Sequence, residues 1–407
     1  MPTTNHTPHD SPSRPLPPTV EESRLTAPVA EQVLTASGFS TLVAEFTAAM
    51  GTASTLDALH TVVRDHGTRL WESAVRRAGN RPGSDGLDPY DDRPLYWART
   101  ASGSVLRSLD NDVLEVQHQR LALLHVLDRT SRGIDRPLWP GAAAGDLRVA
   151  VSGFDPYGLD ADVRHSNPSG CAALQLDGAT FDTPAGRVVV RSVVLPVNYG
   201  DFDQGIVEDA FGPALLAGAD LITTISMTSR GRMDVEKWAA NARGGTPDNS
   251  RDQHFGPVGR AARWAQPNQN PEWIGTTLPH AAMVAAGTGP WPVVLKQGIR
   301  EWPAGSFPDP AALRSNPDPS PGSTAAAGTG GDYLSNESMY RSNRLRLALG
   351  ADDVPGGHLH VSAIVDPADP AAITDAAFEE DRRAVVDQTI ALVRAAAEAV
   401  QAERRSR

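Results

Sequence analysis

Four short apolar runs rich in valine and isoleucine recur after residue 146, and stretches with helical spacing separate them. The runs cover residues 147–151, 188–196, 219–226 and 358–364, and the helical stretches cover 204–216, 335–349 and 375–402. Runs of β-branched residues predict strands, and apolar residues three and four apart predict helices. The alternation predicts a three-layer α/β/α sandwich with an open, twisted, mostly parallel sheet and with functional residues at strand ends.

The chain before this region has a different pattern. Residues 26–140 carry apolar stripes at helical spacing and predict an all-helical N-terminal unit, while 1–25 are rich in proline, threonine and serine and predict a disordered tail. We expect the α/β domain to span 147–407. The turn-forming residues of 79–93 predict a loop, and those of 244–271 and 302–326 predict long surface loops.

Composition excludes several classes of function. The net charge of −12 argues against a nucleic-acid partner, because neutralising phosphates requires clustered lysine and arginine. The single cysteine, Cys171, excludes an internal disulfide, and no apolar run approaches the length of a membrane span. His358 and His360 share a strand face, but no third ligand lies in register with them. We therefore expect neither a metal nor a cofactor, and a cytoplasmic location.

Three separated residues are of the types that form a nucleophile, a base and an orienting acid. Ser335 follows a glycine-rich turn at the start of a predicted helix, His360 lies inside an apolar strand, and Glu236 lies in the alternating run 233–241. A serine attacks only when a base takes its proton, and a carboxylate can hold that base in the right tautomer. Each residue also has a plainer interpretation: Ser335 as a helix cap, His360 as a core histidine and Glu236 as a surface charge on an edge strand.

Six motifs, in order, resemble those of type I pyroglutamyl peptidases. The resemblance spans roughly residues 147–365. The matching segments are Gly153-Phe154-Asp155-Pro156-Tyr157-Gly158, Asn167-Pro168-Ser169, Val235-Glu236 through Asn241 with Pro247-Asp248-Asn249, Thr276-Thr277-Leu278-Pro279, Ala327-Gly328-Thr329 with Asn336 and Met339-Tyr340, and Gly357-His358-Leu359-His360-Val361.

The resemblance implies catalytic roles for Glu236 and His360 and places Ser335 where that family has its cysteine nucleophile. It also implies that Phe154 and Tyr157 hold a flat lactam ring, although both could simply pack the core. Three departures stand out: serine replaces cysteine, Ser226 to Gly231 replace a glycine-rich stretch, and Gly330 and Gly331 are additional. Cys171 is a remote alternative nucleophile, since free cysteines are mostly inert core residues.

Two functions follow as hypotheses. The first is a peptidase or amidohydrolase that removes an N-terminal pyroglutamyl or related group from a peptide or small amide. The second is a non-catalytic module that binds peptide ends in the same pocket. Association into a homo-oligomer is possible under either hypothesis.

Overall fold

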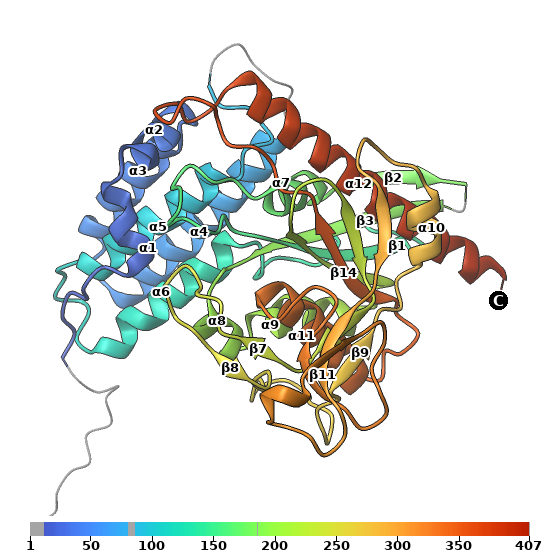
Figure 1. The fold of residues 1–407 in the computed structure, drawn as a ribbon. Coiled ribbons are helices and arrows are strands. Elements are labelled where there is room, and N and C mark those ends of the chain that lie inside the picture. Colours follow the sequence, from blue (N-terminus) through green and yellow to red (C-terminus); the bar gives the residue numbers. More distant parts are fainter. Residues whose placement is uncertain (1–11, 80–85, 185, 407) are drawn as a thin grey trace, which may run out of the picture.

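The computed structural model describes residues 12–79, 86–184 and 186–406. Its centre is a seven-stranded sheet in the order β10-β5-β14-β4-β1-β3-β2 (Figure 1). The four adjacent strands β14, β4, β1 and β3 are parallel to one another. Strand β2 pairs antiparallel with β3, and β5 pairs antiparallel with β14. The strand bounds are β1 Leu147–Phe154, β2 Thr180–Thr183, β3 Gly186–Leu195, β4 Leu221–Met227, β5 Met233–Glu236, β10 Val293–Lys296 and β14 Gly356–Val361.

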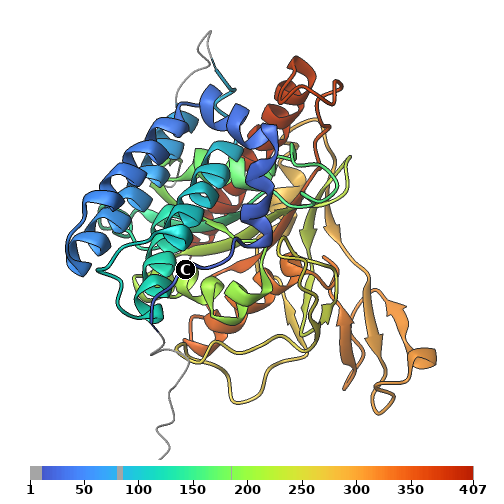
Figure 2. The same cartoon turned by 90° about the vertical axis from the view of Figure 1, so that its left-hand side faces the viewer.

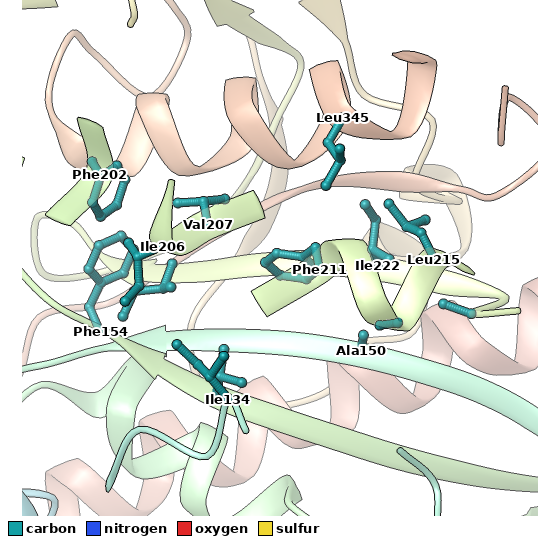
Figure 3. Close-up of a cluster of buried hydrophobic side chains, with 14 of the residues drawn as sticks. Ile134, Ala150, Phe154, Phe202, Ile206, Val207, Phe211, Leu215, Ile222 and Leu345 are labelled. Carbon is teal, nitrogen blue, oxygen red and sulfur yellow. The ribbon is translucent and has the colours of Figure 1, made fainter. Parts of the chain in front are cut away.

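Helices cover both faces of this sheet. Helices α7 (Pro168–Leu176) and α12 (Ala376–Ser406) pack together on one face, with α10 (His280–Ala285) against α12, and α9 (Ile206–Leu216) and α11 (Leu334–Ala348) pack on the other. Successive residues of a strand point to opposite faces. Accordingly, Val149 and Val151 of β1 pack in the buried cluster that contains residues of α12. Ala150 packs in the cluster on the other face, which contains residues of α9 and is drawn in Figure 3. The predicted three-layer α/β/α fold is confirmed.

The helical N-terminal segment packs directly on the α/β part. Its elements are α1 Val20–Ser23, the 3₁₀ helix η2 Arg24–Thr26, α2 Pro28–Ala36, α3 Phe39–Thr52, α4 Leu56–Ala78, α5 Arg93–Ser108 and α6 Gln117–Ser131. One buried cluster contains Trp71 of α4 and Leu95 of α5 together with Leu174 of α7 and Val194 of β3. The helices therefore share a hydrophobic core with the edge of the sheet, beside which they lie in Figure 1.

The described part of the expected tail is ordered. Residues 20–23 form α1, whose N-cap Thr19 makes a capping box with Glu22, and the buried Arg24 pairs with Asp160 at 2.9 Å. The prediction of disorder is therefore wrong for residues 12–25, because they find partners on both the helical segment, as Glu22 does with Arg107, and the α/β part. Residues 1–11, and 80–85 of the loop expected at 79–93, lie outside the described residues.

The segments expected to be long surface loops differ from each other. Between 244 and 271 the chain is irregular except for the short pair β7 (Arg243–Gly244) and β8 (Phe255–Gly256). Residues 302–326 instead contribute to a three-stranded antiparallel sheet, which projects from the body in Figure 2. Its strands are β12 Arg314–Asn316, β11 Ile299–Trp302 and β13 Thr324–Ala327, with the 3₁₀ helix η3 at Pro310–Ala312.

The run 233–241, expected as one strand, is divided in two. Strand β5 ends at Glu236, and β6 (Trp238–Ala240) pairs with β9 (Trp273–Gly275) in a separate sheet. Among the described helices no single one is long and apolar enough to cross a membrane; only α2 and α3 together reach that length, across a 99° bend.

Candidate functional site

Strands β14 and β5 bring His360 and Glu236 into contact. The antiparallel register places His358 opposite Glu236 and His360 opposite Asp234, so Glu236 is the diagonal neighbour of His360 on one face. A diagonal pair is within reach of a long side chain. The His360 Nδ1 to Glu236 Oε1 distance is 2.6 Å, and the two residues are only 5% and 2% exposed. The prediction of an edge-strand surface charge is wrong for Glu236, because β10 covers the outer side of β5.

The hydrogen bond decides which nitrogen of His360 is basic. A carboxylate can only accept a hydrogen bond, so Nδ1 carries the hydrogen in the neutral ring and Nε2 keeps its lone pair. The second oxygen of Glu236, Oε2, is buried without a hydrogen-bond partner in the described structure. The pair therefore has the arrangement of a base with its orienting carboxylate.

Asp234 is a second buried carboxylate beside the pair, and the sequence reasoning missed it. One oxygen accepts from Arg232 Nε at 2.7 Å, whereas Oδ1 is buried without a partner among the described residues. Burial, followed by repulsion from Glu236, raises the pKa of Asp234. The available signal was the two-residue spacing of Asp234 and Glu236, which puts both carboxylates on one strand face.

His358 supports the His360 ring from the side. Its two ring nitrogens are hydrogen-bonded to the hydroxyls of Thr224 at 2.7 Å and Ser226 at 2.8 Å. Burial, with a further contribution from His360, lowers the pKa of His358 well below its ordinary value, so the ring is neutral. The rings of His358 and His360 pack edge to face, with their centroids 4.5 Å apart. Because both ring nitrogens of His358 are hydrogen-bonded, its ring is held in one orientation against His360 and has no nitrogen left to bind a metal.

Ser335 is not the cap of helix α11. The N-cap position belongs to Tyr333, which makes no side-chain cap hydrogen bond, and Ser335 is the second helical residue. Asn336 instead bonds the backbone of Ala240 and Ala242, which fastens the helix to β6. The interpretation of Ser335 as a helix cap is wrong, and the first backbone N–H groups of α11 lack a side-chain acceptor at the N-cap.

Helix α11 is held by buried charges rather than by apolar packing alone. Glu337, fully buried, accepts from Arg243 at 2.6 and 2.7 Å and from Arg341 at 2.7 Å. Arg341 and Arg344 both donate to Glu208 of α9, at 3.1 and 3.2 Å. Glu337 and Arg341 each have several charged partners, which hold the helix that carries Ser335. In contrast, Glu208 Oε2 and Arg344 Nε and Nη1 are buried without a partner among the described residues.

A tight turn separates Ser335 from the His360 and Glu236 pair. Gly328 and Gly331 bond each other's backbone at 2.7 and 3.1 Å, and Ser335 Oγ donates to the Gly330 carbonyl at 3.4 Å. A Cβ atom on Gly330 would lie 3.0 Å from His360 Cε1 and 3.3 Å from the Glu236 carboxyl carbon. Within the described residues no hydrogen bond joins Ser335 to His360; Ser335 bonds Gly330 instead, and Gly330 lies against His360 and Glu236.

Ser335 also lines a small pocket together with both predicted ring-binding residues. The pocket has a volume of about 70 Å³, and its wall includes Phe154, Tyr157, Ser226 and Tyr333. Phe154 is also a core residue, since its ring stacks on Phe202 at 6.1 Å (Figure 3), whereas Tyr157 is 36% exposed. At this volume the pocket has room only for a small group.

Neither Cys171 nor a metal site belongs to this constellation. Cys171 is buried, and burial raises the pKa of its thiol well above the ordinary value, so a reactive thiolate is disfavoured. Among the described residues, Asp162, His165 and Asp366 lie close enough together to hold a cation. Asp162 is already paired with Arg164 at 2.7 Å, whose charge opposes a metal ion there.

Comparison with known proteins identifies the family. Residues 4–128 match the PA0049 N-terminal domain, and residues 148–263 and 296–365 match the PA0049 C-terminal domain. A relative from Pseudomonas aeruginosa, the "Uncharacterized protein PA0049", is 30% identical over 432 aligned residues, which cover 82% of this chain and 76% of the relative. The chain belongs to the PA0049 family. In this family member, Glu236, Ser335 and His360 all fall inside the segments matched by the C-terminal domain.

Two crystal structures of pyroglutamyl peptidase I from Bacillus amyloliquefaciens are also similar to this PA0049 family member. They are 18% and 17% identical, cover 62% and 61% of this chain and 95% and 98% of their own chains, and give TM-scores of 0.41 and 0.40. At these TM-scores the likeness supports no inference about activity.

Proposed function

We propose that this PA0049 family member is a hydrolase of small amides or N-terminal peptide bonds, with Ser335 as nucleophile, His360 as base and Glu236 as orienting carboxylate. The observation that carries the proposal is the buried 2.6 Å hydrogen bond between His360 Nδ1 and Glu236 Oε1. It is supported by Ser335, which lines a small pocket together with three aromatic side chains, Phe154, Tyr157 and Tyr333. The motifs resembling those of pyroglutamyl peptidases favour a pyroglutamyl or related group as the acyl part.

The reaction follows from the roles of these groups. The Ser335 hydroxyl attacks the amide carbonyl while His360 Nε2 takes its proton, and the carboxylate of Glu236 stabilises the charged ring that results. The proton then passes from His360 to the leaving amine, and the acyl group remains on Ser335 Oγ until water hydrolyses the ester. The buried Glu236 has no access to bulk water, which strengthens its effect on the ring.

Backbone donors are available for the oxyanion of the intermediate. Tyr333 provides no side-chain acceptor at the N-terminus of α11, and Ser335 and Asn336 are the second and third residues of this 15-residue helix. Helix N-termini stabilise negative charge through free N–H groups and the helix dipole. An oxyanion near Ser335 would be stabilised by these groups, as in other acyl transfers.

The turn at residues 328–331 sets a condition on this mechanism. Ser335 Oγ bonds the Gly330 carbonyl in the free protein, and Gly330 adjoins His360. Catalysis requires this weak 3.4 Å bond to be exchanged for one between Ser335 and His360 when substrate fills the pocket. Catalytic hydrogen bonds commonly tighten only in the substrate complex.

A fluorophosphonate tests the nucleophile without knowledge of the natural substrate. The reagent forms a phosphorus–oxygen bond with an activated serine and loses fluoride, so mass spectrometry of peptides locates the modified residue. We expect modification at Ser335 in the full chain, at least 100-fold slower modification after His360→Gln, and none after Ser335→Ala. Release of a fluorescent amine from pyroglutamyl amides then tests the acyl specificity. Modification of other serines but not of Ser335 would contradict the proposal.

The same geometry favours a second candidate function, a non-catalytic module that binds peptide ends. The specific observation is the turn between Ser335 and His360, which leaves the two without a hydrogen bond in the described structure. A binding module would take up pyroglutamyl peptides in calorimetry without cleaving them, and Ser335 would not react with the fluorophosphonate. The two functions therefore give opposite results in the same pair of experiments.

A further inference from the structure

A second and much larger pocket lies between the helical segment and the α/β part. Its volume is about 500 Å³, within the range of small-molecule sites, and residues of α1, α5, α6 and α8 (Tyr199–Asp203) line it. None of its lining residues belongs to the pocket of Ser335. Its role is therefore separate from the proposed hydrolysis.

One side of this pocket carries two carboxylates that lack a cation. Glu21 accepts only from the Tyr96 hydroxyl at 3.0 Å and the Asn249 amide at 3.3 Å, and no ion pair to Glu21 or Asp201 occurs among the described residues. Burial and the neighbouring acids raise the pKa of both carboxyl groups, that of Asp201 to about 7. Both carboxyl groups therefore favour the neutral form more than usual, and each would gain charge if a cation bound beside it.

Two arginines act on these carboxyl groups without a hydrogen bond to them: Arg132 on both, and Arg99 on Glu21. Arg132 lies close enough to oppose these pKa increases, but its hydrogen bonds go to Asp128 at 2.7 Å, to Asp155 at 2.6 Å and to the Val194 carbonyl at 3.3 Å. Of the other arginines that line the pocket, Arg107 bonds Glu22 at 2.9 Å. No described cation forms an ion pair with Asp201 or Glu21, so both carboxyl groups are available to a cationic group of a ligand.

The pocket also contains a buried donor without an acceptor. Arg99 is 6% exposed, and its Nη2 donates to Asp155 at 2.5 Å, but its Nη1 is buried with no partner among the described residues. Leaving such a charged donor unsatisfied costs more than leaving a neutral one. Because Nη1 is buried, a ligand carboxylate pairs with it only when Arg99 shifts toward the cavity, and the planar guanidinium then matches the carboxylate.

We propose that this pocket binds a small zwitterion, a free α-amino acid, with its ammonium group at Asp201 and Glu21 and its carboxylate at Arg99. The unpaired acids and the unpaired guanidinium nitrogen are complementary to the two charges of such a molecule. Arg99 and Arg132 also hold Asp155, which stands between Phe154 and Tyr157 of the smaller pocket. The ligand would thus contact the residue that fixes the loop bearing both aromatic side chains.

Binding to the full chain tests the proposal directly. The twenty L-amino acids are screened singly by thermal shift at pH 8, where Asp201 is charged, and those that raise the melting temperature are titrated by calorimetry. We expect at least one to bind with a Kd of 1 mM or tighter. Its N-acetyl derivative, which lacks the ammonium, and its amide, which lacks the carboxylate, should each bind at least tenfold more weakly.

Variants assign the binding to this pocket. Asp201→Asn should weaken binding at least tenfold and raise the melting temperature of the free protein, because it removes a carboxylate repelled by Asp128, Glu21 and Asp155. Asp65→Asn, on the exposed face of α4, should leave the affinity unchanged. Absence of binding by all twenty amino acids, equal binding of the N-acetyl derivative, unchanged affinity of Asp201→Asn, or stabilisation by magnesium or calcium chloride alone would each overturn the proposal.

Discussion

Replacement of Glu236 by glutamine isolates the role of its charge. The two side chains have the same shape, and the carboxylate accepts a 2.6 Å hydrogen bond from His360 in a site where Glu236 is 2% exposed. A hydrogen bond to a charged group contributes about 1.5–3 kcal/mol, against about 0.5–1.5 kcal/mol for a neutral one. The difference of about 1–2 kcal/mol acts on the charged ring of the transition state and corresponds to a rate loss of roughly 5- to 30-fold.

The loss is larger if the glutamine amide turns its NH₂ group toward His360. Nδ1 would then have to accept, Nε2 would carry the hydrogen, and the base would be lost, as in the corresponding change of a serine protease triad, which costs about 10⁴. We therefore expect kcat/KM, or the rate of fluorophosphonate modification of Ser335, to fall between about 5-fold and 10⁴-fold. The free energy of unfolding should change by less than about 1 kcal/mol, because the weaker bond at Oε1 is offset by removal of the cost of burying a charged carboxylate whose Oε2 has no partner.

The assay is the release of a fluorescent amine from a pyroglutamyl amide, with fluorophosphonate modification as the substrate-independent measure. Glu301→Gln is a matched control, since Glu301 is also fully buried and accepts hydrogen bonds from Asn316 and Ser320, but lies in the projecting sheet. It should leave the rate within twofold of the wild type. If Glu236→Gln also changes the rate by less than twofold while the wild type is active, the carboxylate has no part in the chemistry and the triad is refuted.

Three further predictions concern the rest of the chain. Cys171→Ala should leave the rate within twofold of the wild type, and iodoacetamide at neutral pH should not modify the native thiol; rapid alkylation would contradict the raised pKa. Burial lowers the pKa of His66 to about 4, so the stability that His66 provides above its unfolded pKa of about 6.5 is lost as pH falls toward 4, by roughly 3 kcal/mol. Urea unfolding at pH 7 and 4 should show this loss in the wild type and a smaller one in His66→Gln. Glu337→Ala should destabilise the fold by about 3–5 kcal/mol in the same assay, because it leaves Arg243 and Arg341 buried without their shared carboxylate; a loss under 1 kcal/mol would show that water replaces it.

The sequence by itself determined the layers of the fold and the chain position of the strongest site candidates. Valine-rich runs such as 188–196 have to be buried on both faces of a parallel sheet, so strand identity follows from composition and local spacing. The same local signals predicted that His360 and Glu236 lie on strands, and the motif order linked them to Ser335. These properties depend on residues near one another in the chain, which sequence patterns record.

Only the tertiary structure decided which of these residues meet. Whether Glu236 contacts His360 depends on the antiparallel register of β5 and β14, and no local pattern fixes a pairing between segments 124 residues apart. The same holds for Asp234, for the order of residues 12–25, whose polar groups gain partners only on packing, and for the separation of β5 from β6. The turn that holds Ser335 lies against the imidazole at Gly330, where a Cβ atom would come within 3.0 Å of His360 Cε1. Nothing in the local sequence indicates that a charged residue such as Glu337 is buried. The fold buries Glu337 because Arg243, 94 residues away in the chain, and Arg341 both donate hydrogen bonds to it.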